Sequence, residues 1–176
     1  MKIKREWAMP NADTFSIPPI SALIGQYIVG DWVDPFARNS PFKKYCIATN
    51  DLNTEMNTTH HVEALEFLKQ FADESLDGVL FDPPYSPRQI SECYKSVGMK
   101  VHMEDTQSSF YSERKREIAR IVKPDGVVIS FGWNSGGIGK SLNFDLEELL
   151  LVAHGGAHND TICTVERKQK DLFSNG

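Results

Sequence analysis

Short apolar runs alternate with helical patterns along the chain, and this alternation constrains the fold more than any other feature of the sequence. Residues 62–71 and 112–122 carry apolar side chains at helical spacing. Candidate strands, rich in β-branched and aromatic residues and bounded by turn formers, cover residues 27–33, 45–49, 78–81, 126–131, 148–152 and 161–165. Strands that alternate with helices form a mostly parallel sheet covered on both faces. The sequence therefore predicts an α/β fold, and its length predicts one domain over residues 1–176.

The last two predicted strands differ from the others, because only residues 154–159 separate them. A parallel crossover needs about a dozen residues or more, whereas antiparallel strands join through a short turn. We therefore expect an antiparallel hairpin at one edge of the sheet. Residues 123–126 (Lys-Pro-Asp-Gly) predict a helix stop and a turn before the strand at 126–131.

Composition and charge exclude several classes of protein. No window approaches the roughly 18 unbroken apolar residues of a membrane span, and the charged start leads into polar residues rather than a signal peptide. We therefore expect no membrane association and a cytoplasmic location. Cys46, Cys93 and Cys163 lie too far apart for a disulfide framework or a clustered zinc site, so no metal is expected. The net charge of −5 argues against a protein that holds nucleic acid by bulk electrostatics.

One region is basic although the whole chain is acidic. Residues 86–123 contain eight basic residues against five acidic ones, as a surface that contacts phosphate would. Arg116 and Arg120 share a helix face, and Arg88 lies on the preceding helical stretch. Arg88, Arg116 and Arg120 are therefore the candidate nucleic-acid contacts. A solvated helix with mixed ion pairs would explain the same charges.

The segment after the predicted strand at 78–81 carries the most chemistry. Asp82, Pro83, Pro84 and Tyr85 follow that strand directly, and ligands of parallel sheets bind beyond the carboxyl ends of strands. Asp82 offers an acceptor for an amino group, the two prolines stiffen the turn, and Tyr85 offers a flat ring on which a base can stack. A simple proline turn with a capping aspartate would use the same residue types.

This tetrapeptide resembles the signature of S-adenosylmethionine-dependent amino methyltransferases, above all the small phage and prophage-type enzymes that methylate N6 of adenine in DNA. Residues 34–40 (Asp-Pro-Phe-Ala-Arg-Asn-Ser) resemble the cofactor loop of that family, with Arg38 and Asn39 where glycine is common. Residues 154–162 resemble its terminal hairpin. The resemblance covers nearly the whole chain. It implies a Rossmann-like class I methyltransferase fold, S-adenosylmethionine as cofactor and site-specific, adenine-specific DNA methyltransferase activity.

The resemblance also implies roles for individual residues. Asp82, Pro83, Pro84 and Tyr85 would be catalytic, with Asp82 and the Pro83 carbonyl accepting from the adenine amino group and Tyr85 holding a base rotated out of the helix. Asp51 stands where Rossmann-like proteins place an acid for the ribose hydroxyls, and an Asx turn is the alternative. The implied cofactor-binding residues are Phe15, Ile17, Asp34, Pro35, Phe36, Asn39, Ser40, Asp51, Leu52, Glu63 and Asp82.

Simpler explanations exist for two parts of this set. Glu63 resembles an acid that lies close to the cofactor's adenine in related enzymes, but an acid at a helix N-terminus is favourable in any case. Residues 14–20 resemble the segment that folds over the methionine part of the cofactor. A packed N-terminal arm would explain them nearly as well.

The expected partner is DNA, either a duplex with a flipped adenine or a single strand. Residues 86–112 are the candidate target-recognition or catalytic-loop insertion, and a protein partner or a homodimer could also supply recognition. Alternatives are methylation of adenine or guanine in RNA, methylation of cytosine N4, and a non-catalytic subunit that keeps the cofactor fold.

Two further motifs predict other sites only weakly. Residues 134–141 resemble a phosphate-binding loop, but a Walker loop requires glycine where this chain has Asn134, and it opens a long helix. His154 and His158, with no cysteine nearby, make a weak metal site. We expect a glycine-rich turn at 134–141 and hydrogen-bonded imidazoles in the hairpin.

Overall fold

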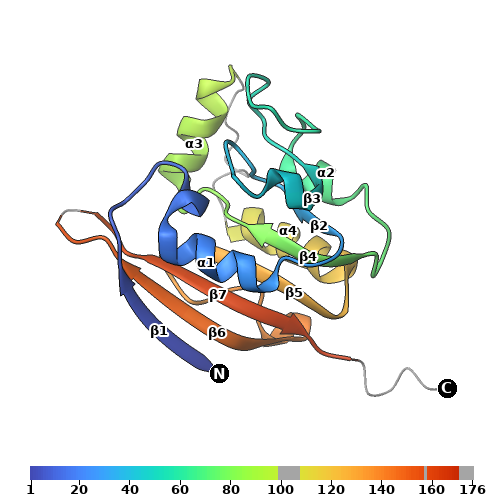
Figure 1. Ribbon diagram of the computed structural model, residues 1–176. Helices are drawn as coiled ribbons and strands as arrows, with labels where there is room; N and C mark the ends of the chain where they lie inside the picture. The colour runs from blue at the N-terminus through green and yellow to red at the C-terminus, as the bar shows by residue number, and fades with distance from the viewer. Residues whose placement is uncertain (99–107, 157, 171–176) are drawn as a thin grey trace.

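The computed structural model describes residues 1–98, 108–156 and 158–170, and its centre is one seven-stranded sheet (Figure 1). The strand order is β1-β6-β7-β5-β4-β2-β3. β7 is antiparallel to both of its neighbours, and the other neighbouring strands are parallel. The strands are β1 (Lys2–Trp7), β2 (Trp32–Asp34), β3 (Cys46–Thr49), β4 (Leu76–Phe81), β5 (Val122–Gly132), β6 (Phe144–Ala153) and β7 (Thr161–Lys168).

Helices cover both faces of this sheet (Figure 1). One face packs against α1, and the other against α2 and α4. None of the helices in the described part of the chain has the length and apolar character of a membrane span. The helices are α1 (Pro18–Tyr27), α2 (Ala64–Leu68), α3 (Pro87–Ser96) and α4 (Ser108–Ile121), and the 3-10 turns are η1 (Thr14–Ser16), η2 (Lys43–Tyr45) and η4 (Lys140–Leu142).

The predicted fold class is confirmed. The sheet is mostly parallel, and β6 and β7 form the antiparallel hairpin that the short connection at 154–159 predicts. The expected place of this hairpin at an edge of the sheet is wrong, because β1 pairs with β6 on its outer side. The strands β2, β3 and β4 run parallel, so their carboxyl ends lie at the same end of the sheet. The segments that follow these three strands therefore lie close together, which is where ligands of such sheets bind.

The predicted strand at 27–33 is wrong over residues 27–31. The strand covers only Trp32–Asp34, because α1 continues to Tyr27. Pro18 and Pro19 occupy the first helical positions, where a missing N–H leaves no helical bond unmade. The helix then buries apolar side chains at helical spacing, and this burial outweighs the β-branched residues that follow Tyr27.

Residues 2–7 form β1, a strand that the residue pattern does not predict. All of its side chains are exposed, so it lacks the alternation of apolar and polar residues that marks a half-buried strand. The predicted turn at 123–126 exists as a bulge inside β5. There Asp125 has a left-handed backbone (φ 65°), and the register with β4 shifts between Leu76 and Gly78.

Candidate active site

A cleft of about 470 Å³ lies at the carboxyl ends of β2, β3 and β4. Its walls include the loop after β2, the segment after β3 and the tetrapeptide after β4, three segments that are far apart in sequence. Among the residues predicted to bind cofactor or acceptor, the cleft is lined by Pro35, Phe36, Asp51, Leu52, Glu63, Asp82, Pro83, Pro84 and Tyr85. The structure therefore brings most of the predicted site into one cavity.

The other predicted cofactor residues do not line this cleft. Phe15 is buried in the core, where its ring packs 4.6 Å from that of Phe131. Ile17 is also buried and borders a second cavity. Asn39 is exposed, and the buried Ser40 hydroxyl accepts from Phe42 N, so both shape the loop from outside the cleft.

The loop after β2 makes its sharp turn at Arg38. This residue has a left-handed backbone (φ 39°), the conformation that glycine adopts most readily, and its side chain lines the cleft. Asp34 is fully buried beneath the loop, and its Oδ1 accepts from Phe36 N at 3.0 Å. Burial, followed by the charges of Asp82 and Asp51, raises the pKa of Asp34 well above its usual range.

The segment after β3 is tied to the same loop. Asp51 accepts from Arg38 N through Oδ2 at 3.2 Å and from Asn53 N through Oδ1 at 2.8 Å. The neighbouring Asn50 is buried, and its side chain bonds to the Pro35 carbonyl and to both backbone groups of Val62. These bonds hold the Asp51 carboxylate at the cleft wall.

The tetrapeptide joins β4 to α3 through a well-defined helix start. Ser86 caps α3 by accepting from Gln89 N at 3.2 Å, and Pro87 follows at the first helical position. Gln89 in turn accepts from Tyr85 N at 2.6 Å. The prolines and this cap leave Tyr85 little backbone freedom, so its ring is held at the boundary of the cleft.

Asp82 is the best-positioned acceptor of the site. The Tyr85 hydroxyl donates to Asp82 Oδ1, and the side chain of Thr14 also bonds to this carboxylate. Burial raises the pKa of Asp82, and these two bonds and the positive charge of Arg38 oppose that rise. Thr14 belongs to the segment 14–20 that resembles a cofactor-covering segment, but its contact with Asp82 was not predicted, because the two residues lie far apart in the chain.

Glu63 lines the cleft at the start of α2. Its carboxylate caps α2 by accepting from Leu65 N at 3.0 Å, and it also accepts from Tyr94 Oη at 2.7 Å and from Arg114 at 2.5 Å. Arg114 is buried and lies over the Phe110 ring. Glu63 thus links α2, α3 and α4, in addition to lining the cleft.

A second cavity of about 360 Å³ lies next to the first and shares Thr14, Tyr85 and Gln89 with it. Trp133, which follows β5, lines this cavity and packs edge-on against Tyr85 with ring centroids 5.5 Å apart. Tyr85 therefore stands between two cavities. Trp133 follows a strand at its carboxyl end, and the positional rule that selected Asp82 would have selected Trp133 as well.

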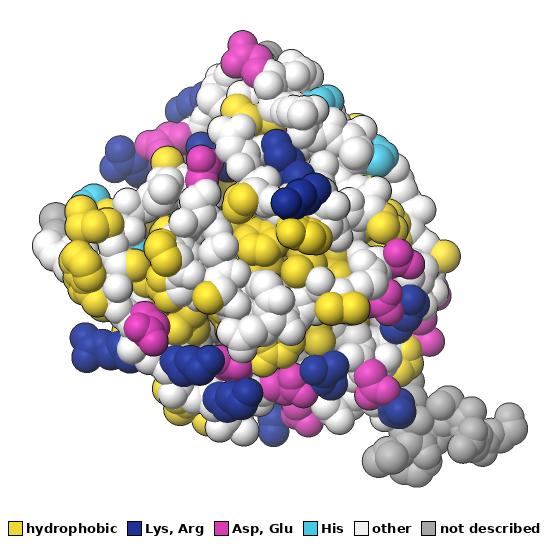
Figure 2. All heavy atoms as spheres, viewed as in Figure 1, with side chains coloured by type: hydrophobic (Ala, Val, Ile, Leu, Met, Phe, Trp, Pro, Cys, Tyr) yellow, Lys and Arg dark blue, Asp and Glu magenta, His cyan; other side chains and the backbone are white. Residues whose placement is uncertain are grey.

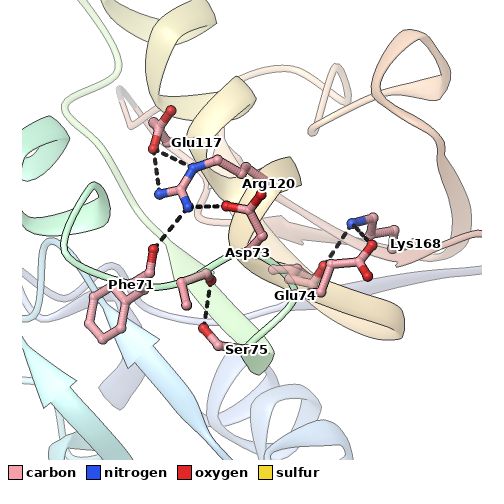
Figure 3. A network of polar contacts seen from close by, with 9 residues as sticks. Phe71, Asp73, Glu74, Ser75, Glu117, Arg120 and Lys168 are labelled. Carbon is pink, nitrogen blue, oxygen red and sulfur yellow. Dashed lines mark hydrogen bonds and ion pairs between the residues drawn. The ribbon is translucent and has the colours of Figure 1, made fainter.

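The three candidate nucleic-acid contacts do not form one surface. Arg88 lies on α3 close to the cleft and is 87% exposed, with an ion pair to Glu92 at 2.8 Å. Arg120 lies at the opposite end of the strands, because the residue bonds through its carbonyl to Glu74 N just before β4. Figure 3 shows its guanidinium held by Glu117, Asp73 and the Phe71 carbonyl. Arg116 is exposed on the same helix.

The glycine-rich segment 134–141 binds a carboxylate of the protein itself. Ile138 N and Gly139 N donate to Glu166 at 2.5 and 2.9 Å, and a side chain added at Gly137 would meet the same carboxylate. The short turn η4 follows instead of a long helix. The backbone N–H groups that a Walker loop would offer to a phosphate are thus bonded to Glu166. The segment forms a turn, as expected from the weak match to that motif.

His154, one of the two hairpin histidines, has local partners. His154 is buried, and its ring nitrogens lie 2.9 Å from the Ala8 carbonyl and 2.9 Å from Thr161 Oγ1. Within the described residues, no group of three potential ligands could hold a metal ion. Part of the predicted insertion at 86–112, residues 99–107, lies outside the described residues.

No family model matches the sequence, and no curated protein matches it either. Solved structures do match. A SAM-dependent methyltransferase from Archaeoglobus fulgidus is 12% identical, with 86% of this chain and 94% of that chain covered and a TM-score of 0.57. The 1,6-didemethyltoxoflavin-N1-methyltransferase from Burkholderia thailandensis, with bound 1,6-didemethyltoxoflavin and S-adenosylhomocysteine, is 12% identical, with 86% and 77% covered and a TM-score of 0.57.

TrmN from Thermus thermophilus is 15% identical at a TM-score of 0.57, with 86% of this chain covered and 49% of TrmN. The present chain thus spans about half the length of TrmN. At these identities the likeness establishes the fold, which is the Rossmann-like methyltransferase fold.

Proposed function

We propose that the protein transfers a methyl group from S-adenosylmethionine to an exocyclic amino group of a nucleobase, with N6 of adenine in DNA as the acceptor. The observation that carries this proposal is the position of Asp82-Pro83-Pro84-Tyr85 at the carboxyl end of β4, between two cavities. One cavity would hold the cofactor and the other the acceptor. A structural neighbour with bound S-adenosylhomocysteine supports the choice of cofactor.

The larger cleft fits S-adenosylmethionine in size and in charge. Its volume of about 470 Å³ is within the range of small-molecule sites. Asp34, Asp51 and Asp82 lie close enough that the other two charges raise the pKa of Asp34, and a cationic ligand would relieve this repulsion. Asp51 would accept from the ribose hydroxyls, and Phe36 would contact the apolar parts of the ligand. When bound, the cofactor supplies a methyl group on a positively charged sulfur.

Asp82 would act on the acceptor amino group. The nitrogen of such a group is a poor nucleophile, because its lone pair is delocalised into the ring. By accepting a hydrogen bond from it, Asp82 would draw the nitrogen toward tetrahedral geometry and stabilise the positive charge that develops during transfer. The amino proton becomes acidic once the methyl is in place. The raised pKa of Asp82 suits this carboxylate to receive that proton.

Tyr85 and Trp133 would form the acceptor site on the far side of Asp82. A base in a duplex must leave the stack before its amino group can be reached, and a single strand avoids that cost. In the present structure the Tyr85 hydroxyl donates a hydrogen bond to Oδ1 of Asp82. An incoming amino group would take that place, and the Tyr85 ring would then stack on the base beside Trp133.

Nucleic acid would contact the cations at the rim of the cleft. Arg38 lines the cleft, and Arg88 on α3 is almost fully exposed. Lys43 Nζ donates to the Arg38 carbonyl at 3.0 Å and adds a positive charge at the same rim. Arg120, with three acceptors already in contact, is the weakest of the predicted phosphate contacts.

The test is to incubate the protein with labelled S-adenosylmethionine and separate pools of duplex DNA, single-stranded DNA and RNA, and to identify the modified nucleoside by mass spectrometry. N6-methyladenine in DNA is the expected product. N4-methylcytosine, or label only in RNA, would reassign the acceptor. Cofactor binding without transfer to any pool would favour the non-catalytic subunit.

A further inference from the structure

The edge strand β1 buries almost nothing in this chain. Each of its six residues is exposed, and its contacts with the sheet include the backbone pairing with β6 and an ion pair from Lys4 to Glu148 at 2.7 Å. Ile3 and Trp7 are 67% and 65% exposed, and Met1 and Met9 at either end are exposed too. A strand of this kind leaves a row of apolar side chains and unpaired backbone groups in water, which usually marks a contact surface.

The hydrogen bonds between β1 and β6 show which residues of β1 point their backbone groups away from the sheet. Ala8 N donates to the Ala153 carbonyl of β6 at 3.1 Å. Backbone groups of a strand alternate between its two edges, so the even-numbered residues pair with β6 and the odd-numbered residues point outward. Ile3, Arg5 and Trp7 therefore present their N–H and carbonyl groups to a new strand.

The side chains of β1 are also sorted by face. Lys4 bonds to Glu148, which accepts from Tyr27 of α1 at 2.9 Å, so the even-numbered side chains lie on the face that carries α1. Ile3 and Trp7 lie on the other face, in register with Leu149 and Ala153 of β6, which are partly exposed. An apolar strip thus runs along one face of the edge.

We propose that this edge is the interface of a homodimer, in which two β1 strands pair antiparallel about an axis at Lys4 and join their sheets. On one face, this register places Lys2 of each copy opposite Glu6 of the other copy, so that two such pairs form. On the other face it places Ile3 opposite the apolar stem of Arg5, and Met1 opposite Trp7. The like charges that meet at Lys4 are already neutralised by Glu148 of each copy.

The charge pattern is the reason to choose a second copy rather than an unrelated strand. Lysine on an edge normally discourages pairing, but here the sequence Lys2-Ile3-Lys4-Arg5-Glu6 is complementary to itself when it is reversed. Figure 2 shows basic side chains with an acidic one among them along the lower left edge, where Figure 1 draws β1. The strands of the two copies would run in opposite directions, so the two clefts would open at opposite ends of the joined sheet.

The test is sedimentation velocity over a range of protein concentrations, with reversed charges. Lys2→Glu and Glu6→Lys each convert two attractive cross-strand pairs into repulsive ones, so each is expected to weaken the dimer about tenfold. The double variant Lys2→Glu with Glu6→Lys restores opposite charges in the dimer and is expected to recover the wild-type dissociation constant. Arg5→Pro removes an outward N–H without touching the ladder to β6, and is expected to leave a monomer.

Thermal melting of every variant checks that the fold is intact. A wild-type chain that stays monomeric up to about 100 μM would overturn the proposal. So would a dimer that none of these substitutions weakens, because that dimer would use another surface. Failure of the double variant to recover the dimer would refute the antiparallel pairing about Lys4.

Discussion

Replacing Arg114 by methionine tests how the cleft is held together. Arg114 is 5% exposed and its partner Glu63 is 27% exposed, with 2.5 Å between them. Removing one partner of a buried ion pair costs about 3–5 kcal/mol of unfolding free energy, because the remaining charge is left buried. Glu63 keeps its bonds from Leu65 N and Tyr94 Oη and is partly solvated, so we expect the lower end of that range.

The expected loss is therefore about 3 kcal/mol, which for a domain of this size corresponds to a melting temperature lower by roughly 6–12 °C. Urea unfolding measures it through the midpoint at unchanged slope. Arg116→Met, at an exposed site two residues further along α4, is the matched control and should stay within about 0.5 kcal/mol of wild type. An Arg114→Met protein as stable as this control would refute the structural role of the pair.

Substitutions at three further positions test the candidate site. Asp51→Ala should weaken S-adenosylmethionine binding by about 1–3 kcal/mol in calorimetry, and unchanged affinity with an intact fold would remove Asp51 from the site. Tyr85→Phe keeps the ring and should retain most of the turnover that Tyr85→Ala loses; equal inactivity would assign the role to the hydroxyl. Burial raises the pKa of Asp34, so the folded state binds more protons than the unfolded state above about pH 4, and stability falls as pH rises. The unfolding free energy of Asp34→Asn, measured by urea unfolding, should therefore fall less steeply between pH 4 and 8 than that of wild type. An identical pH dependence in the two proteins would show that the pKa of Asp34 is not raised.

The convergence of the candidate site residues on one cleft could be predicted from the sequence, because it follows from where the strands end. Asp82 comes directly after one predicted strand and Asp51 two residues after another, and parallel strands bring such positions to the same end of the sheet. The start of α3 has a typical residue pattern, with Ser86 as the cap and Pro87 at the first helical position. The family resemblance marked Arg38 and Asn39 as positions where glycine is common, and the structure has a left-handed backbone at Arg38.

Contacts between distant segments could not be predicted in this way. Arg114 and Arg120 belong to the same basic run, yet Arg114 is buried against Glu63 and Arg120 is held by Asp73 and Glu117. The partners Glu63 and Asp73 lie far along the chain from α4, and no spacing rule connects them to it. Phe15 was assigned to the cofactor by resemblance, and its packing against Phe131 in the core was not predicted.

The most direct test of the proposed chemistry is to compare binding and turnover in Asp82→Ala. The Asp82 contact strengthens toward the transition state, so its loss should lower the turnover of S-adenosylmethionine with DNA by about 100-fold or more. The dissociation constant for S-adenosylmethionine, measured by calorimetry on the same preparation, should change by less than about tenfold, which is 1.4 kcal/mol. An Asp82→Ala protein that methylates DNA at the wild-type rate would contradict the assignment of Asp82 as the catalytic acceptor.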